Sequence, residues 1–453
     1  MFRVFLFSIF CAHSLFAQNY DFSAVDRLLQ DSLQTAFNGN VLVRIEQNDE
    51  LIYRFQAGNI AEQTRRAIAS CTKWISGAVV LALAEKGYFS LDDSVGQYLP
   101  VFSQNGKGHF TIRQAFSMTS GLYSNDRYET DSDLTLEQSV DSIAANVPLR
   151  FSPGTMLAYD GSGMQVIGRL AEVVTGKDWQ TIAREQILDK CGMTTTTYDV
   201  FGKNPAIAGG IRSSARDYMR FLQMVFHDGE YRGERVLSTA SISEMFTNQS
   251  GAAPVLYSPF PPRHPDYAYG ADTLRYAFGS WVFAENPETK TVEEISSPGA
   301  FGSYPWVDRK RNLTGITFTF LLINGRRDRD TQMKMMRLVR EIIDGTTGVQ
   351  ETGNRVPHTS ALLANYPNPF SVRNDGTTTI RYQLTSAGDI GLAIYDLTGR
   401  LVRTLASGRQ NAGIYSARWD GRDAYGQDVA AGVYLYRLKT DRQVLVRRMV
   451  LLR

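Results

Sequence analysis

The chain has 453 residues, of which 43% are hydrophobic and 21% are charged, and its formal net charge is +2. This length suits one large domain with a smaller one, and the composition is that of a globular protein. The nearly neutral charge gives no electrostatic reason to expect a nucleic acid or an anionic membrane surface as a partner.

The first residues have the layout of a secretory signal peptide. A short start with Arg3 precedes an apolar run over residues 4–10, and Ala17 offers a small residue for cleavage. The apolar run is too short to span a bilayer, so we expect no transmembrane segment. We therefore predict that residues 1–17 are a signal peptide and that the protein is exported. A buried N-terminal strand is the alternative.

The periodicity that follows predicts an α+β domain over residues 18–344. Strand-like and helical segments alternate so that strands lie near both ends and helices fill the middle. This order favours an antiparallel sheet flanked by helices, with an all-helical insert. The predicted strands are 40–46, 50–57, 276–284, 303–308 and 315–323, and the predicted helices are 23–36, 74–86 and 331–343 around a mainly helical stretch at 111–246.

The last part of the chain has a different pattern. Residues 345–363 contain glycine, proline and small polar residues without periodicity, which predicts a linker. Residues 364–453 alternate apolar and polar positions, as in 380–384 and 390–394, between regularly spaced glycines. That pattern predicts a small all-β sandwich of the immunoglobulin-like type.

One short motif carries candidate chemistry. Ser70 and Lys73 open the apolar helix predicted at 74–86, and their spacing puts both side chains on one face, one turn apart. Apolar surroundings would favour a neutral amine on Lys73, which can act as a base. The helix N-terminus would also direct N–H groups toward Ser70, where negative charge develops in acyl transfer. Ser70 is the predicted nucleophile.

A series of short motifs lies around Ser70 and further along the chain. They are residues 67–73, 82–87, 91–95, 111–113, 119–122, 153–155 with Tyr159, Gly168, 172–176, 192–194, and Gly209-Gly210 with Asp217. In sequence and in order these motifs resemble those of the β-lactamase-related serine hydrolases, a family of class C β-lactamases, D-alanyl-D-alanine carboxypeptidases and esterases. The resemblance covers residues 21–344 and implies a β-lactamase/transpeptidase-like fold.

The resemblance places the second catalytic group of the family at Tyr159. A phenol has an ordinary pKa of about 10, so it needs nearby positive charge to act as a base, and Lys73 would supply that charge. Whether Lys73 or Tyr159 takes the serine proton stays open. The alternative for Tyr159 is a buried aromatic residue that bonds through its hydroxyl.

The third motif departs from the family, which places Lys or His, any residue, then Gly on a strand beside the site. Here the matching stretch is Ser297-Pro298-Gly299-Ala300. Gly299 would allow close approach of a substrate, and the Ala300 N–H would be the second oxyanion donor beside that of Ser70. An ordinary glycine-rich hairpin is the alternative. Because Pro298 has no N–H for a ladder, we expect this strand at an edge of the sheet.

Two departures concern the substrate. Gly161 stands where β-lactamases and peptidases of the family carry Asn, and Ser297 replaces the cation that pairs with a substrate carboxylate. Hydrogen bonds to a charged group contribute about 1.5–3 kcal/mol each, so their loss disfavours anionic substrates. Arg212 and Arg309 would compensate, but both are expected to be solvated surface charges. We predict an uncharged carboxylic ester as substrate.

Other functions stay open at this point. A D-Ala-D-Ala carboxypeptidase or β-lactamase would act on a cell-wall peptide or another amide instead of an ester. A non-catalytic receptor of the penicillin-binding type would keep the fold without turnover.

Neither a cofactor nor a metal ion is expected, because no Cys/His spacing resembles a metal site. Cleavage of the leader would leave Cys71 and Cys191, which we expect to be buried thiols.

The C-terminal part, residues 364–453, resembles the sorting domain of type IX secretion cargo. The residues that carry this resemblance are 365–370, 395–400, 419–421 and 432–434. It implies the secretion machinery as a partner and a final location outside the cell or on its surface. An accessory sandwich that binds carbohydrate or protein is the alternative.

Overall fold

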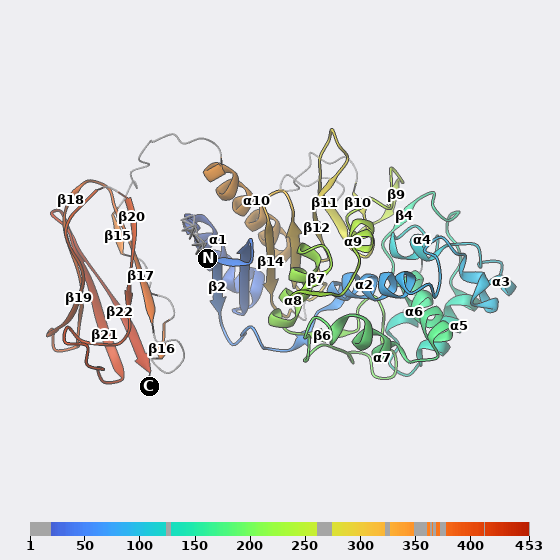
Figure 1. The fold of residues 1–453 in the computed structure, drawn as a ribbon, viewed down its shortest axis with the longest axis horizontal. Coiled ribbons are helices and arrows are strands. Elements are labelled where there is room, and N and C mark those ends of the chain that lie inside the picture. The colour runs from blue at the N-terminus through green and yellow to red at the C-terminus, as the bar shows by residue number, and fades with distance from the viewer. Residues whose placement is uncertain are drawn as a thin grey trace, which may run out of the picture. The chain divides into compact units, whose positions relative to one another are not determined.

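The structure is a computed structural model that describes residues 20–123, 128–260, 274–321, 327–347, 360–362, 365, 368–371, 377–411 and 413–452. The predicted signal peptide and most of the predicted linker lie outside these residues. The chain divides into two compact units, Met1–Gly348 and Val349–Arg453, which are described separately (Figure 1). In the described ranges, no helix combines the length and the apolar character needed to cross a membrane.

A seven-stranded antiparallel sheet is the frame of the first unit. Its strands are β1 (Val41–Gln47), β2 (Glu50–Ala57), β10 (Arg275–Tyr276), β11 (Trp281–Glu285), β12 (Val292–Ser296), β13 (Tyr304–Asp308) and β14 (Leu313–Phe318). Their order in the sheet is β10-β11-β12-β13-β14-β1-β2. The N-terminal hairpin of β1 and β2 therefore pairs, through β1, with β14, the last strand of the unit. Segments that are distant in the sequence are thus neighbours in the sheet.

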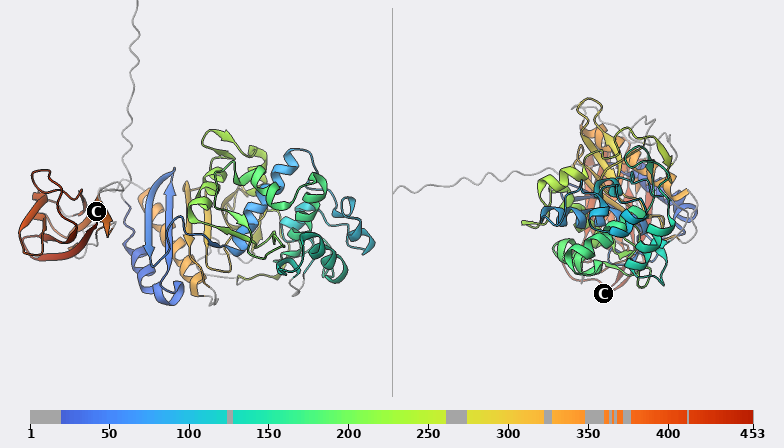
Figure 2. Two further views of the ribbon diagram at one scale, coloured as in Figure 1. Left: turned by 90° about the horizontal axis from the view of Figure 1, so that it is seen from below. Right: turned by 90° about the vertical axis from the view of Figure 1, so that its right-hand side faces the viewer.

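The helices of this unit lie around the sheet and in a separate helical region (Figures 1 and 2). They are α1 (Ser23–Phe37), α2 (Thr72–Glu85), α3 (Pro100–Gln104), α4 (Ile112–Phe116), α5 (Leu136–Asn146), α6 (Ser162–Thr175), α7 (Trp179–Ala183), α8 (Ala215–Phe226), α9 (Thr239–Met245) and α10 (Arg327–Thr347). Every residue of α2 from Thr72 to Leu83 is buried, because α6, α7 and α9 pack around it. The prediction of a helix buried on all sides is confirmed.

Helices cover both faces of the sheet. The strand register puts Glu46 and Glu294 in adjacent rows, so their side chains point to opposite faces. Glu46 accepts a hydrogen bond from Gln223 of α8, and Glu294 accepts one from Arg340 of α10. Helix α1 packs against α10. The flanked antiparallel sheet predicted from the sequence is confirmed, with α8 on one face and the terminal helices on the other.

Short strand pairs connect the helical region with the sheet. They are the three-stranded sheet β3 (Arg66–Ala67), β6 (Ile211–Ser213) and β5 (Thr197–Tyr198), the parallel pair β4 (Leu157–Ala158) and β9 (Val255–Tyr257), and the hairpin β7 (Glu230–Tyr231) and β8 (Glu234–Arg235). The first two groups hold the segments that carry Ser70 and Tyr159.

Three local predictions differ from the structure. The strand predicted at 276–284 is divided into β10 and β11, because Gly279 has a φ of +83° and turns the chain. The sequence pattern did not indicate β12. Helix α10 is longer than predicted and runs to Thr347, into the segment expected to be a linker.

The second unit is a sandwich of two sheets around one core. The three-stranded sheet has the order β15-β17-β20, and the five-stranded sheet has the order β16-β22-β21-β18-β19. Side chains from both sheets form a common core that includes Tyr382, Leu392 and Tyr436. The predicted all-β sandwich is confirmed. Its strands are β15 (Ala361–Leu362), β16 (Phe370–Ser371), β17 (Thr378–Leu384), β18 (Gly388–Tyr395), β19 (Leu401–Gln410), β20 (Gly413–Trp419), β21 (Gly432–Lys439) and β22 (Val444–Leu452).

Candidate active site

The predicted nucleophile lies in a tight turn at the start of α2. Ser70 belongs to a single 3-10 turn, Ala69–Cys71, that continues into α2. Ala69 has a φ of +46°, in the left-handed region that residues with a β-carbon seldom adopt. The surrounding strands hold this turn, since the Ile68 N–H donates to the Ile211 carbonyl at 3.0 Å. Ser70 is left partly exposed while the following helix is buried.

Lys73 lies within hydrogen-bond distance of Ser70. Its Nζ is 3.0 Å from Ser70 Oγ and 2.8 Å from the carbonyl oxygen of Ala208. The residue is 5% exposed. The i,i+3 spacing therefore brings the amine to the hydroxyl as predicted, and Ala208 fixes its second contact. Nothing in the sequence indicated Ala208, because it contributes a backbone carbonyl, which every residue type has.

Tyr159 lies on the other side of the amine. The centre of its ring is 4.8 Å from Lys73 Nζ, and the ring stacks on Trp281 with a centroid distance of 5.0 Å. Its backbone N–H donates to the Tyr257 carbonyl at 3.0 Å, which ties it to β9. A second neighbour is Tyr276, whose pKa is raised well above the ordinary value by burial and by the nearby Tyr159. Tyr276 is therefore a neutral, fully buried residue that packs behind Tyr159, with a ring-centroid distance of 6.0 Å.

A cavity of about 430 Å³ opens beside these side chains. Among its described lining residues, Lys73 is the one basic side chain, and Glu129 and Asp160 are acidic. The predicted residues that it brings together are Ser70, Lys73, Tyr159 and Gly161, and the aromatic lining that the sequence did not indicate is Tyr123, Phe201, Tyr257 and Phe301.

Gly161 is packed against its neighbours on the cavity wall. A β-carbon at this position would lie 3.2 Å from Ala208 Cβ and 3.2 Å from Glu129 Cγ. Both distances are shorter than an ordinary van der Waals contact. A larger side chain such as Asn would therefore require Glu129 and Ala208 to shift by a few tenths of an ångström.

The hydroxyl of Ser297 faces the backbone of the nucleophile. Ser297 Oγ donates to the Ser70 carbonyl at 2.9 Å and lies 3.4 Å from the Gly279 carbonyl. The residue is 1% exposed and does not line the cavity. This geometry does not support the predicted substrate contact of Ser297. It makes Ser297 a link between the third motif and the turn that carries Ser70.

Gly299 and Ala300 follow close to the same turn. A β-carbon at Gly299 would lie 2.2 Å from the Ile68 carbonyl oxygen and 3.1 Å from Cys71 Sγ. Glycine is thus required at position 299, because the backbone there lies too close to the Ile68 carbonyl to leave room for a side chain. Ala300 is exposed, next to the cavity-lining Phe301. The oxyanion role of its N–H stays a prediction.

The expectation that this strand lies at an edge is wrong. Strand β12 pairs with β11 on one side and with β13 on the other. It ends at Ser296, so Pro298 stands beyond the ladder and need not donate to it.

Neither arginine proposed as a compensating cation lines the cavity. Arg212 pairs with Asp199 at 3.3 Å. Arg309 pairs with Asp228 at 2.6 Å and lies over the Phe246 ring. The described residues around the cavity therefore include no arginine that could bind a substrate carboxylate.

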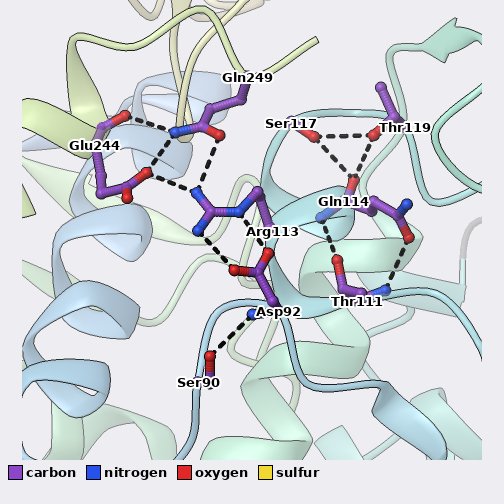
Figure 3. Close-up of polar contacts among 9 residues, drawn as sticks. All are labelled: Ser90, Asp92, Thr111, Arg113, Gln114, Ser117, Thr119, Glu244 and Gln249. Atoms are coloured by element: carbon purple, nitrogen blue, oxygen red, sulfur yellow. Dashed lines mark hydrogen bonds and ion pairs between the residues drawn. The ribbon is translucent and has the colours of Figure 1, made fainter.

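The motif at 111–122 contacts the segment that carries Tyr159 and is itself held by a network of side-chain bonds. Figure 3 shows Arg113 donating to Asp92, Glu244 and Gln249, at 2.7, 2.6 and 3.1 Å. These bonds join α4 to α9, to Gln249 in the segment after α9, and to Asp92 in the segment before α4. The loop after α4 then accepts the Ala158 N–H at the Met118 carbonyl, 2.9 Å away. The network thereby fixes the segment next to Tyr159.

Among the described residues, no cluster of three or more His, Cys, Asp or Glu side chains could hold a metal ion. Both Cys71 and Cys191 are free and buried, as predicted. Burial raises the pKa of both thiols, to about 12 for Cys191.

Comparison with known proteins places this fold among the β-lactamase-type serine hydrolases. The family model of β-lactamases matches residues 25–334, and a model of the FlgD Ig-like domain matches residues 369–443. The chain belongs to the β-lactamase family.

Two curated relatives share limited identity with the chain. Penicillin-binding protein 4 of Amycolatopsis lactamdurans is 25% identical over 230 residues, which cover 44% of this chain and 57% of that protein. Protein flp of Staphylococcus aureus is 28% identical over 148 residues, which cover 30% of this chain and 28% of that protein. The match thus spans 57% or less of the length of these relatives.

Solved structures share the fold. A candidate β-lactamase from Bacteroides dorei is 25% identical with a TM-score of 0.64, covering 72% of this chain and 99% of that one. Simvastatin synthase from Aspergillus terreus is 17% identical with a TM-score of 0.54, covering 71% and 94%. A penicillin-binding protein homologue from Pyrococcus abyssi is 15% identical with a TM-score of 0.57, covering 94% and 100%.

Proposed function

We propose that this protein is an exported serine hydrolase that cleaves a carboxylic ester through an acyl-enzyme on Ser70. The observation that carries the proposal is the 3.0 Å contact between Lys73 Nζ and Ser70 Oγ, with the amine also anchored on the Ala208 carbonyl. A hydroxyl becomes an effective nucleophile when a positioned base can take its proton. Membership in the β-lactamase family supports the same chemistry.

The reaction proceeds in two steps. Ser70 Oγ bonds to the ester carbonyl carbon while its proton passes to the Lys73–Tyr159 pair. The N–H groups of Ser70 and Ala300 stabilise the oxyanion. The C–O bond to the alcohol then breaks, and the pair returns the proton to the departing oxygen. In the second step water attacks the acyl-enzyme, gives a proton to the pair, and the carboxylic acid leaves as Ser70 regains its proton.

Two features support an ester over a substrate with a carboxylate. Lys73 is the one basic side chain among the described residues of the cavity, and its amine is already engaged in hydrogen bonds to Ser70 and Ala208. Position 161 holds glycine packed against Glu129, where an amide side chain would bind the amide of a peptide or β-lactam. Both features remove interactions that would bind an amide substrate with a negative charge.

Turnover of p-nitrophenyl butyrate by the purified mature protein tests the proposal. Wild type is expected to hydrolyse the ester, and a Ser70→Ala variant to lose turnover. Ser90→Ala, which removes an exposed serine hydroxyl outside the cavity, is the matched control and is expected to retain it. Mass spectrometry of quenched reactions is expected to find the butyryl group on the peptide that contains Ser70. A stable fold without acylation would instead indicate a non-catalytic receptor.

Nitrocefin and a D-Ala-D-Ala peptide distinguish the enzymes within the family. The proposal predicts values of kcat/KM at least tenfold below that of the ester. If either substrate equals the ester, the protein is a β-lactamase or a carboxypeptidase and the ester preference is wrong.

For the second unit we propose a sorting role in type IX secretion, followed by release or attachment outside the cell. The resemblance of 365–370, 395–400, 419–421 and 432–434 to sorting domains supports it, and the match to an Ig-like domain agrees with the sandwich. Deletion of the residues from Asn365 onward is expected to stop export in a host with that secretion system. Normal export of the truncated protein would contradict the sorting role.

A further inference from the structure

The cavity beside Ser70 has an aromatic wall for which the proposed chemistry has no use. Tyr257 and Tyr123 both line the cavity, and their ring centres lie 5.3 Å apart with the planes tilted by 35°. Tyr257 is 44% exposed. Large apolar side chains that stay exposed in a cavity with polar groups are typical of a ligand-binding surface.

The backbone fixes this wall relative to the proposed catalytic residues. Tyr257 belongs to β9, which pairs in parallel with β4, and Ala158 of β4 is its partner in the register. The carbonyl of Tyr257 accepts the N–H of Tyr159 at 3.0 Å. The wall is therefore joined by backbone bonds to the residue that lies over Lys73, so a group resting on it stays at a fixed place relative to Ser70.

The chemistry of the wall selects the kind of group that it binds. Burial and the nearby Tyr257 and Asp160 raise the pKa of Tyr123, so its phenol is neutral. Two tyrosine rings offer flat π-faces, and aromatic rings attract one another beyond the burial of area. Phe301 adds a ring elsewhere in the lining, held against Phe320 at a centroid distance of 5.2 Å. A planar ring gains more from these faces than a saturated ring of equal size.

We propose that Tyr257 and Tyr123 form an aromatic subsite that binds an aromatic ring of the ester substrate. This inference rests on the proposed ester hydrolysis and names the substrate class. The cavity of about 430 Å³ is large enough for a ring in addition to the ester group. Tyr257 is then the residue that determines specificity, because it is the more exposed of the two rings.

Matched pairs of esters without a chromophore test the subsite. Methyl phenylacetate and methyl cyclohexylacetate differ only in the ring on the acyl side, and benzyl acetate and cyclohexylmethyl acetate differ only on the alcohol side. Rates of acid release are followed by pH-stat. The wild type is expected to prefer the aromatic member of at least one pair by about threefold to tenfold in kcat/KM. Equal rates within both pairs would overturn the proposal.

Variants at the wall give the second test. Tyr257→Leu keeps apolar bulk but removes the ring, and it is expected to abolish the preference, whereas Tyr257→Phe is expected to retain it. Tyr88→Leu is the matched control, since Tyr88 has a similar exposure of 42% and does not line the cavity. Thermal melting confirms that each variant is folded. An unchanged preference in folded Tyr257→Leu would overturn the proposal.

The two proposals fail in different ways. If the wild type hydrolyses none of the four esters and also does not hydrolyse p-nitrophenyl butyrate, the proposal of an ester hydrolase is itself wrong. If it hydrolyses them without regard to the ring, only the aromatic subsite is wrong.

Discussion

Two corners of one site are built in different ways. Ser70 and Lys73 lie three residues apart on α2, and their contact follows from helical spacing. The other corner of the site joins Tyr159 to Tyr257 on the cavity wall, and Ser297, which lies outside the cavity, to the Ser70 carbonyl; these residues come from distant segments of the chain. The first corner holds the proposed nucleophile and base, and the second positions them and borders the substrate. The contact between the proposed nucleophile and base is thus local in sequence, while the contacts that position them, and the place of Tyr159, depend on long-range packing.

Removal of the amine should have the largest effect. Lys73→Met keeps the length of the side chain but deletes the proton acceptor, and a positioned base contributes about 10²- to 10⁴-fold to rate. We expect kcat/KM for p-nitrophenyl butyrate to fall by that factor. Lys177→Met, on an exposed lysine that pairs with Glu185, is the control and should be unaffected. A Lys73→Met enzyme within tenfold of wild type would show that the local corner does not carry the chemistry.

Ser297→Ala tests the long-range corner. It removes the bond to the Ser70 carbonyl, which is of the kind that contributes about 1 kcal/mol, so we expect kcat to fall about fivefold with little change in KM. Ser297→Thr keeps the hydroxyl and should restore part of the loss.

Ser296→Ala is the matched control for Ser297→Ala. Ser296 is also buried and donates to the Pro305 carbonyl, so its loss should lower stability without this effect on kcat. Equal losses of kcat in Ser296→Ala and Ser297→Ala would remove the positioning role.

The Arg113 network should affect stability more than rate. Arg113→Ala loses its bonds to Asp92, Glu244 and Gln249. Asp92 is 68% exposed, so solvent screening reduces that contribution, and we expect the free energy of unfolding to fall by about 1–2 kcal/mol. Chemical denaturation measures it.

Arg337→Ala, which removes an exposed i,i+4 pair with Glu341 on α10, is the control for Arg113→Ala and should cost less. A stability equal to that of wild type in Arg113→Ala would show that the network does not hold the loop next to Tyr159.

The last prediction concerns the pH dependence of stability. Burial raises the pKa of Cys71 above that of a free thiol, which is about 8.5, so the folded thiol stays protonated when the unfolded one ionises. Its contribution to stability is therefore intact below pH about 8.5 and falls above it, by up to about 1.4 kcal/mol per pH unit. Unfolding at pH 7.5 and pH 10 should show this decline in wild type and less of it in Cys71→Ala. Rapid alkylation of the native protein by iodoacetamide at pH 8 would contradict the burial.

Local patterns predicted much of the fold. The apolar run after Lys73 indicated the buried helix α2, and the alternation at 380–384 indicated a strand with one buried face, which β17 has. Strand β12 was not predicted because its two glutamates interrupt the apolar pattern. Glu294 is nevertheless buried, since Arg340 of α10 lies 3.0 Å away and compensates its charge. The partner is 46 residues further along the chain, so no local window contains the reason.

By itself, the sequence determined which residues share a helical turn and which strand faces are apolar, because these depend on a repeat of two to four residues. It thereby predicted the contact of Ser70 and Lys73 and the sandwich that follows. Only the tertiary structure decided that Ala208 holds the Lys73 amine, that Ser297 bonds to the Ser70 backbone, and that Tyr257 borders the cavity. Those contacts depend on which distant segments lie next to each other. The packing of the whole unit determines that, and residue type alone does not.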